Sequence, residues 1–300
     1  MKILLFGPNG QVGWELQRSL SPLGRVISLD RQGMEGLAGN LTQPEGLAES
    51  IRATAPDVIV NAAAYTQVDQ AESEPDAARV VNARAPGVMA REAAMCDAWL
   101  VHYSTDYVFS GKGATPWRED DTPEPVNFYG QTKLEGEEAV RRSGCRHLIF
   151  RTSWVYSQRG RNFLKSILRL ASDREGLRVV DDQFGAPTAA ELIADVTAHA
   201  IRAVQMCGSL TGTYHLAAAG ETSWCGYARL VIEEAEKSGC KLKAKAEDIE
   251  PVPSEQFPTP APRPRNSRLA ITRLEQALSL HFPPWEYGVI RCLHGLCSKK

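Results

Sequence analysis

Residues 2–13 read KILLFGPNGQVG, and this stretch decides the fold. A short apolar run, typical of a buried strand, meets Gly7, Gly10 and Gly13 in the spacing G-x-x-G-x-x-G. Glycines let a backbone turn tightly and approach a diphosphate without a clash from Cβ. The residues that follow have the apolar spacing of a helix, whose first N–H groups can bind an anion. This strand, turn and helix therefore predict a cradle for the diphosphate of a dinucleotide.

The rest of the chain alternates short apolar runs, typical of strands, with stretches of helical periodicity. Runs such as 58–60 and 148–150 are apolar on both faces, as in parallel strands that helices cover on both sides. The alternation predicts an α/β fold with a doubly wound parallel sheet of the Rossmann type. We predict strands at residues 2–6, 25–29, 57–61, 99–103, 147–151, 177–180 and 213–216. We predict helices at residues 12–20, 78–94, 134–142, 163–170 and 189–203.

The chain is expected to form two lobes. Residues 1–150, joined by about 171–217, should form the dinucleotide-binding Rossmann domain. A smaller α/β lobe for the substrate should draw on about 151–170 and on 218–300. Six prolines within residues 251–264 favour extended backbone rather than helix. That segment is either a rigid connector or a wall of the substrate site.

Composition excludes several classes of protein. The 300 residues carry 34 Lys plus Arg and 36 Asp plus Glu, so the net charge of -2 is not that of a nucleic-acid binder. No apolar run approaches the roughly 20 residues that span a bilayer, so we expect no membrane partner. The seven cysteines are odd in number and form no C-x-x-C pair, which suggests neither a disulfide framework nor a zinc site. We therefore expect a protein of the reducing cytoplasm.

Two neighbouring residues bear on the choice of cofactor. The second predicted strand ends at Asp30, whose carboxylate can accept a hydrogen bond from a ribose 2′-hydroxyl. Arg31 follows directly and could instead hold a 2′-phosphate. The sequence therefore leaves NADH and NADPH as alternatives.

A phenol, an ammonium and a hydroxyl form the predicted catalytic set. Tyr129 and Lys133 stand four residues apart, which places them on one face of a helix. Hydride reduction of a ketone leaves an alkoxide that needs a proton, whereas a free tyrosine has a pKa of about 10. A cation about 4 Å away would supply the roughly 4 kcal/mol that lowers this pKa by about 3 units. Thr105 follows the fourth predicted strand, where its hydroxyl can stabilise the oxyanion. We predict Tyr129 as the proton donor, tuned by Lys133.

These motifs resemble those of the short-chain dehydrogenase/reductase superfamily, in which the glycine spacing, an N-A-A segment at 61–63 and a Thr-Tyr-Lys set occur together. Longer segments resemble one family of its extended class, the dTDP-4-dehydrorhamnose reductases. The matching segments include VNAAAYTQVD at 60–69, VHYSTDYVF at 101–109, RTSWVY at 151–156, DDQFGAPT at 181–188 and RPRNSRL at 263–269. The resemblance covers essentially the whole chain.

The resemblance implies reduction of the C4 ketone of dTDP-4-dehydro-β-L-rhamnose to dTDP-L-rhamnose, a precursor of bacterial surface polysaccharides such as O-antigen. It implies sugar contacts from Thr105, Asp106 and Trp154. Arg263 is our own inference for the diphosphate, because a guanidinium matches phosphate oxygens. The cofactor contacts predicted from the glycine turn and from the resemblance are Gly7, Gly10, Gln11, Val12, Gly13, Asp30, Arg31, Asn40, Leu41, Ala63, Ala64, Tyr65, Tyr129 and Lys133.

The same family is associated with Mg²⁺ that bridges a homodimer through acidic side chains. Glu15 and Glu191 stand where two such acids are expected. Gly295 stands where a third acid would be wanted, and this departure speaks against the metal bridge and the dimer. The sequence thus assigns no firm metal site.

Three other functions compete with a reductase. A nucleotide-sugar 4,6-dehydratase would need an Asp-Glu pair after the catalytic Thr, but here Asp106 is followed by Tyr107. A nucleotide-sugar epimerase would keep its nicotinamide bound through purification, whereas a reductase exchanges it at every turnover. A non-catalytic subunit, similar to the regulatory subunit of methionine adenosyltransferase, would not need the intact catalytic set.

Overall fold

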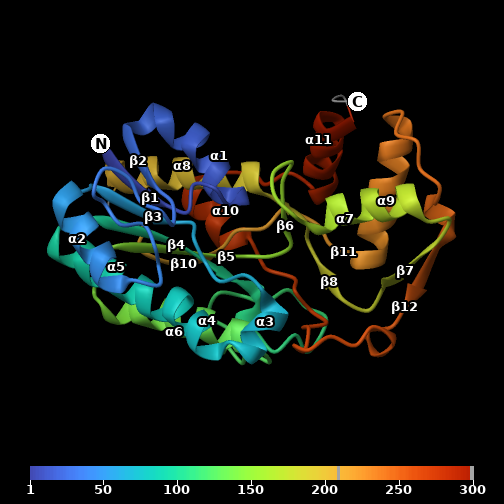
Figure 1. Cartoon of the computed structure of the whole chain (residues 1–300), viewed down its shortest axis with the longest axis horizontal. Coiled ribbons are helices and arrows are strands. Elements are labelled where there is room, and N and C mark those ends of the chain that lie inside the picture. The colour runs from blue at the N-terminus through green and yellow to red at the C-terminus, as the bar shows by residue number, and fades with distance from the viewer. Residues whose placement is uncertain (208–209, 298–300) are drawn as a thin grey trace.

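Six parallel strands form the central sheet of this computed structural model, which describes residues 1–207 and 210–297 (Figure 1). They lie in the order β2-β1-β3-β4-β5-β10, so the chain reverses direction across the sheet between β1 and β3. Ligands of such sheets bind beside this reversal, at the carboxyl ends of the strands. The strands are β1 (Lys2–Phe6), β2 (Arg25–Leu29), β3 (Val58–Asn61), β4 (Trp99–Thr105), β5 (His147–Thr152) and β10 (Gly212–His215).

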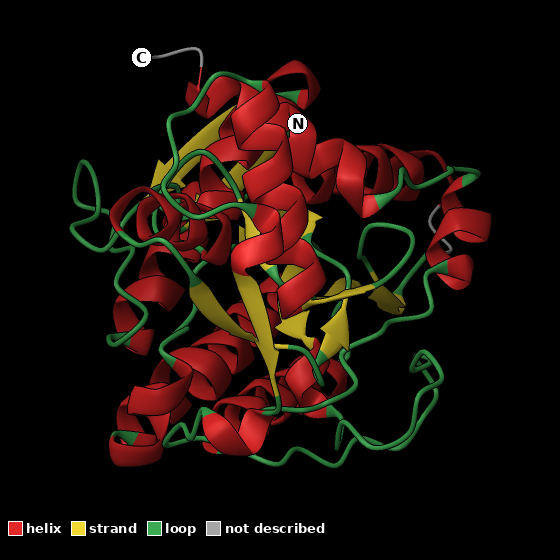
Figure 2. Ribbon diagram, turned by 90° about the vertical axis from the view of Figure 1, so that its right-hand side faces the viewer, coloured by secondary structure: helices red, strands yellow, loops and turns green. Residues whose placement is uncertain are grey.

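Helices cover both faces of this sheet, so its strands lie in the interior (Figure 2). Side chains of β1 alternate between two hydrophobic cores: Ile3 and Leu5 belong to one, Leu4 and Phe6 to the other. The doubly wound fold predicted from the sequence is therefore confirmed. One face carries α1 (Gln11–Leu20), α8 (Ala190–Cys207) and α10 (Thr272–Leu278), and the other carries α2 (Pro44–Thr54), α5 (Ala85–Met95) and α6 (Phe128–Arg142).

A second lobe with its own hydrophobic core lies beside the sheet, to the right in Figure 1. Tyr227, Val231 and Val289 are fully buried within that core. Its helices are α7 (Phe163–Asp173), α9 (Trp224–Lys237) and α11 (Trp285–Cys297). Its strand pairs are β6 (Val155–Tyr156) with β9 (Thr188–Ala189), β7 (Leu177–Val180) with β12 (Ile249–Val252), and β8 (Phe184–Gly185) with β11 (Thr222–Ser223).

The boundary between the lobes differs from the predicted one at two places. The strand expected at 177–180 forms, but it pairs with β12 and packs into the second core rather than joining the central sheet. Conversely, Leu274 and Phe282, expected in the substrate lobe, pack into a core of the central sheet. Hydrophobic periodicity predicts an element but does not say which of two cores will bury it.

Short elements complete the chain. Near the carboxyl end of β3, α3 (Val68–Ser73) and α4 (Pro75–Arg79) lead into a π-helical turn, Val80–Arg84, which continues as α5. Short 3₁₀ turns occur at Ser21–Leu23, Asp106–Val108, Ala246–Asp248 and Ser254–Gln256. Across the described ranges, no helix has both the length and the apolar character needed to cross a membrane.

One disulfide departs from the sequence-based expectation. Cys240, just after α9, is bonded to Cys297 at the end of α11, with their Cα atoms 6.3 Å apart. The two residues are 57 positions apart, and only the packing of α9 against α11 brings them together. The cysteine spacing suggested no disulfide framework and gave no sign of this one bond.

Candidate active site

The glycine turn fits the diphosphate cradle predicted for it. A Cβ on Gly7, which has φ +80°, would lie 2.8 Å from the backbone nitrogen of Ala63. A Cβ on Gly13 would lie 2.0 Å from the carbonyl oxygen of Gly7. Only glycine can therefore occupy these positions without moving the backbone. The first turn of α1 contains no acidic residue, so its N-terminal partial charge is left for an anion.

A cavity of about 760 Å³ adjoins this turn at the carboxyl ends of β1, β2 and β3. Nine predicted cofactor residues line it, namely Gly7, Gly10, Asp30, Arg31, Asn40, Leu41, Ala63, Ala64 and Tyr65. The other five, Gln11, Val12, Gly13, Tyr129 and Lys133, are not on its wall. The side chain of Gln11 is instead engaged by Asn162, which donates to its Oε1 at 2.8 Å and so ties α1 to the second lobe.

Asp30 and Arg31 differ in how the surrounding loop engages them. The carboxylate of Asp30 accepts hydrogen bonds from Asn9 Nδ2 at 3.0 Å and from the backbone nitrogen of Gln32 at 2.8 Å. Arg31 is exposed at the same cavity, and no hydrogen bond or ion pair holds its guanidinium among the described residues. Arg31 is therefore the residue of the two that can turn toward an added anion.

Asn82, which sequence reasoning missed, joins the cofactor cavity to the catalytic helix. It is 1% exposed and lies in the π-helical turn. Its side-chain amide accepts from the backbone nitrogen of Tyr65 at 2.9 Å and donates to the backbone oxygen of Tyr65 at 3.1 Å. Its Nδ2 also donates at 3.1 Å to Thr132, which stands between Tyr129 and Lys133 on α6. The signal available in the sequence was a single amide within an apolar helical stretch, which indicates no particular role.

The fold brings Thr105 and Tyr129 into contact. Thr105 ends β4, and Tyr129 lies in the first turn of α6, where Asn127 caps the helix by accepting from the nitrogen of Gly130 at 2.8 Å. The side chain of Thr105 lies close enough to the phenol of Tyr129 to lower the pKa of that phenol. The Thr105 hydroxyl also donates to Oδ1 of Asp106 at 3.1 Å. A phenol and a hydroxyl are thus held side by side at the ligand-binding edge of the sheet.

The expected effect of Lys133 on Tyr129 is not what the structure shows. Burial raises the pKa of Tyr129 to about 12, and the neighbouring Thr105 side chain offsets only part of that rise. Lys133 is buried and donates to the carbonyl oxygen of Tyr103 at 2.6 Å, while burial lowers its own pKa to about 8. The prediction that Lys133 lowers the pKa of Tyr129 is therefore wrong for this structure, and Tyr129 is fully protonated at neutral pH.

Asp106 lies beside this pair and is 3% exposed. Its Oδ2 has no hydrogen-bond partner in the structure. Burial raises the pKa of the carboxyl to about 7, against a smaller lowering by its hydrogen bonds. Asp106 therefore changes charge near neutral pH, next to the two hydroxyls.

A second cavity, of about 880 Å³, lies in the other lobe and is lined by α7, β7 and the proline-rich segment 251–264. This segment therefore forms part of a cavity wall, as one of its two predicted interpretations required. Tyr107 lines this cavity and packs edge-to-face against Tyr129, with 5.7 Å between ring centroids. Tyr129 is thus one ring away from the larger cavity, although neither cavity wall includes Thr105, Tyr129 or Lys133. Lining residues that the sequence analysis missed are Phe163, Arg174, Arg178 and Trp224.

Trp154 and Arg263 both lie close to this larger cavity. Trp154 has φ +48° and stacks on Trp224 with 3.6 Å between centroids, so it supports the wall rather than lining it. Arg263 lines the wall and forms an ion pair with Asp69 of α3 at 2.9 Å. It would have to share its guanidinium with that carboxylate when binding a diphosphate.

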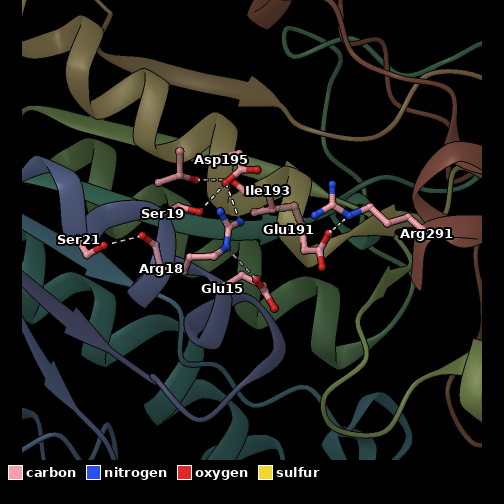
Figure 3. Close-up of polar contacts among 9 residues, drawn as sticks. Glu15, Arg18, Ser19, Ser21, Glu191, Ile193, Asp195 and Arg291 are labelled. Carbon is pink, nitrogen blue, oxygen red and sulfur yellow. Dashed lines mark hydrogen bonds and ion pairs between the residues drawn. The ribbon is translucent and has the colours of Figure 1, made fainter. Parts of the chain in front are cut away.

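The acidic residues considered for Mg²⁺ are paired with arginines (Figure 3). Glu15 lies 3.5 Å from Arg18, and Glu191 lies 3.1 Å from Arg291. Position 295 supplies no third acid, and a Cβ there would lie 2.1 Å from the side-chain nitrogen of Gln158, the movable end of a flexible side chain. Within the described part of the chain, no three acidic, His or Cys side chains are grouped to hold a metal. These residues do not fit a bound Mg²⁺.

Comparison with known proteins agrees with the resemblance in the motifs. Residues 1–297 match the family model described as RmlD substrate binding domain. The chain is 52% identical to the dTDP-4-dehydrorhamnose reductase of Escherichia coli K12 over 296 residues, which cover 99% of this chain and 98% of that protein. It is 46% identical to the Burkholderia thailandensis reductase of the same name over 303 residues, 100% of both. The crystal structure of the Bacillus anthracis dTDP-4-dehydrorhamnose reductase in complex with NADP aligns with a TM-score of 0.85 and 34% identity, covering 97% of this chain and 98% of that one. The chain therefore belongs to the RmlD substrate binding domain family.

Proposed function

We propose that this protein reduces the C4 ketone of dTDP-4-dehydro-β-L-rhamnose to dTDP-L-rhamnose, with a reduced nicotinamide cofactor as the hydride source. The observation that carries the proposal is the proximity of Tyr129 and Thr105, with Tyr129 packed on Tyr107 of the larger cavity, in a fold whose glycine turn adjoins a second cavity. The activity named for relatives that are 46–52% identical over nearly the whole chain supports the substrate.

The chemistry assigned to the chain's own residues is proton donation. Reduction in this direction needs a protonated donor, and the raised pKa of Tyr129, about 12, keeps its phenol protonated at neutral pH. Thr105, close to that phenol, would orient the ketone oxygen and stabilise the charge that develops on it. The cofactor, when bound, supplies the hydride.

The nucleotide would occupy the larger cavity. Phe163 and Trp224 offer aromatic faces for a base, and their ring centroids lie 4.5 Å apart. Arg174, Arg178 and Arg263 line the same cavity and can neutralise a diphosphate. An aromatic face beside three guanidiniums suits a nucleoside diphosphate that carries a sugar toward Tyr129.

The cofactor would lie along the glycine turn, with its adenosine end near Asp30 and Arg31. We propose that the chain accepts both NADPH and NADH, because the exposed guanidinium of Arg31 can meet a 2′-phosphate while Asp30 can meet a 2′-hydroxyl. The NADP that is bound in the Bacillus anthracis relative supports the first alternative.

We also propose a cytoplasmic location, on the ground that four cysteines of the described chain, Cys96, Cys145, Cys225 and Cys292, are free thiols, against one bonded pair, Cys240 and Cys297. A homodimer, where it forms, would assemble without a bridging Mg²⁺, because the acids considered for that metal are already paired with arginines. Cell fractionation and the oligomeric state in chelator test these two proposals.

The deciding experiment measures loss of the reduced-nicotinamide absorbance on adding dTDP-4-dehydro-L-rhamnose, with NADH and NADPH run in parallel. Turnover that depends on the sugar, with dTDP-L-rhamnose as the product, is the expected result. Tightly bound nicotinamide and interconversion of sugars without net oxidation would indicate an epimerase instead. A tightly bound protein partner and no oxidation with any deoxy-ketosugar would indicate a regulatory subunit.

A further inference from the structure

A buried ion pair between Glu137 and Arg151 lies one helical turn beyond Lys133 and takes no direct part in the proposed reaction. The side chains of Glu137 and Arg151 are 0% and 2% exposed. Arg151 donates to both carboxylate oxygens, at 2.9 Å from Nε and at 2.7 Å from the terminal nitrogen. Because removing two charges from water is costly, a pair this deeply buried calls for a reason beyond stability.

The pair is placed where it can act on Lys133. Glu137 follows Lys133 by four residues on α6, so the two side chains lie on one face, one turn apart. Arg151 lies on β5 opposite Ser104 of β4, next to Tyr103, whose carbonyl oxygen receives the Lys133 ammonium at 2.6 Å. The ion pair thus fastens α6 to the sheet one turn beyond the place where Lys133 is held.

The charges around Lys133 leave Glu137 as its anion. From β4, His102 is fully buried, and burial followed by the nearby Lys133 charge drives its pKa well below 6.5, so it is neutral. The phenols of Tyr103 and Tyr129 stay protonated because burial raises their pKa values. Asp106 lies at the far end of the catalytic pair, beyond Thr105. None of these groups is an anion held against Lys133 from the sheet side.

Glu137 stays charged in spite of its burial. Burial alone would raise its pKa, but hydrogen bonds and charges from Arg151, with a further contribution from Arg141, bring the pKa below its ordinary value. The resulting carboxylate opposes the effect of burial on Lys133, whose pKa is lowered by burial and raised by Glu137. Lys133 and Arg151 therefore share one buried negative charge with Arg141, whose terminal nitrogen lies 3.0 Å from the same carboxylate.

We propose that Glu137 and Arg151 are positioning residues for Lys133: Glu137 keeps the buried ammonium charged, and Arg151 limits how strongly it does so. The proposal rests on the proposed function and on the predicted contact of Lys133 with the nicotinamide cofactor. Removing the carboxylate would let Lys133 lose its proton at a lower pH. Removing Arg151 would take away one of the two guanidiniums that pair with Glu137 in the described structure, leaving Arg141 at 3.0 Å, and would raise the pH at which Lys133 loses its proton.

Opposite shifts from the two partners of one ion pair are the test. We would measure the dissociation constant of NADPH against pH by fluorescence, and kcat against pH, for the wild type, Glu137→Gln and Arg151→Met. In the wild type, NADPH binding should weaken and kcat should fall above about pH 8. In Glu137→Gln this limb should move down by about one to two pH units, the size expected from one charge about 6 Å away at an effective dielectric of about 20. In Arg151→Met it should move up.

Glu138→Gln is the matched control, because Glu138 is the next residue, is 45% exposed and, within residues 1–207 and 210–297, has an ion pair only with Arg142, at 3.6 Å. That variant should titrate like the wild type. Should either buried single variant fail to fold, the double variant Glu137→Gln/Arg151→Met removes both buried charges and should show a downward shift smaller than that expected of Glu137→Gln alone, because the two single effects partly cancel. The inference would be overturned if the alkaline decline of binding and kcat occurred at the same pH in the variants as in the wild type. It would also be overturned if that decline moved in the same direction in both single variants. If NADPH binding by the variants shows these shifts but the wild-type protein does not reduce the sugar, the proposed function is overturned instead.

Discussion

Replacing Tyr129 by Phe removes one oxygen atom and little else. The ring of Tyr129 packs edge-to-face on Tyr107, with centroids 5.7 Å apart at an interplanar angle of 80°, and a phenyl ring keeps that contact. Thr105 loses the phenol hydroxyl beside it but keeps its hydrogen bonds with Asp106 and with the nitrogen of Tyr107. The free energy of unfolding should therefore fall by only about 1 kcal/mol.

The effect on catalysis should be much larger. General acid catalysis contributes roughly 10²–10⁴-fold, so kcat of Tyr129→Phe should fall by that factor, equivalent to about 3–5 kcal/mol in the barrier. No titratable side chain in the described structure other than Asp106 lies in the hydrogen-bonded cluster around Thr105 to replace the phenol. The dissociation constant of NADPH should change by less than about threefold, because the glycine turn and its cavity do not include the lost hydroxyl.

The assay is steady-state oxidation of NADPH by dTDP-4-dehydro-L-rhamnose, with NADPH binding measured separately by fluorescence. Tyr107→Phe is the matched control, since it removes the same atom from the neighbouring ring that lines the larger cavity. It should retain turnover within about tenfold of the wild type. Activity of Tyr129→Phe within tenfold of the wild type would refute the assignment of Tyr129 as proton donor.

Three further predictions concern charge. Because the pKa of Asp106 is raised from 3.8 to about 7, its burial should destabilise the fold increasingly as pH rises from about 4 to about 7, by up to roughly 4 kcal/mol. Asp106→Asn should therefore melt above the wild type at pH 8 and close to it at pH 4; equal melting temperatures at both pH values would contradict this. Arg31→Ala should weaken NADPH binding about three- to tenfold and leave NADH binding unchanged, and equal losses for both cofactors would exclude contact with the 2′-phosphate. A chelator should change neither the turnover nor the oligomeric state, as measured by light scattering, and dissociation or inactivation on removing metal would show that Glu15 and Glu191 bind Mg²⁺ after all.

The sequence was most informative where local spacing dictates geometry. The glycine turn could be predicted because its strand, turn and helix are adjacent in the chain, and a Cβ on Gly7 or Gly13 would clash with the backbone. The approach of Tyr129 to Thr105 could be predicted because both lie at the carboxyl edge of one parallel sheet. Such arguments need only the order of strands and helices.

Features that depend on long-range packing could not be predicted in the same way. The pKa of Tyr129 is governed by burial, which no spacing of residues reveals, and Lys133 is not among the groups that shift it. Trp224, at the start of α9, lines the larger cavity, but no motif in the sequence around it indicates that role. Cys240 and Cys297 are brought together by the packing of α9 against α11. Leu274, far along the chain, packs into a hydrophobic core of the central sheet.

The central claim is that this chain delivers hydride to a ketone carbon and a proton to the adjacent oxygen. The most direct measurement uses nicotinamide deuterated at the transferable C4 position and locates the label in the product by NMR. Deuterium at C4 of the deoxysugar, with one equivalent of oxidised cofactor per product, is the predicted result. Label at any other carbon, or product formed without net oxidation of the cofactor, would contradict the account.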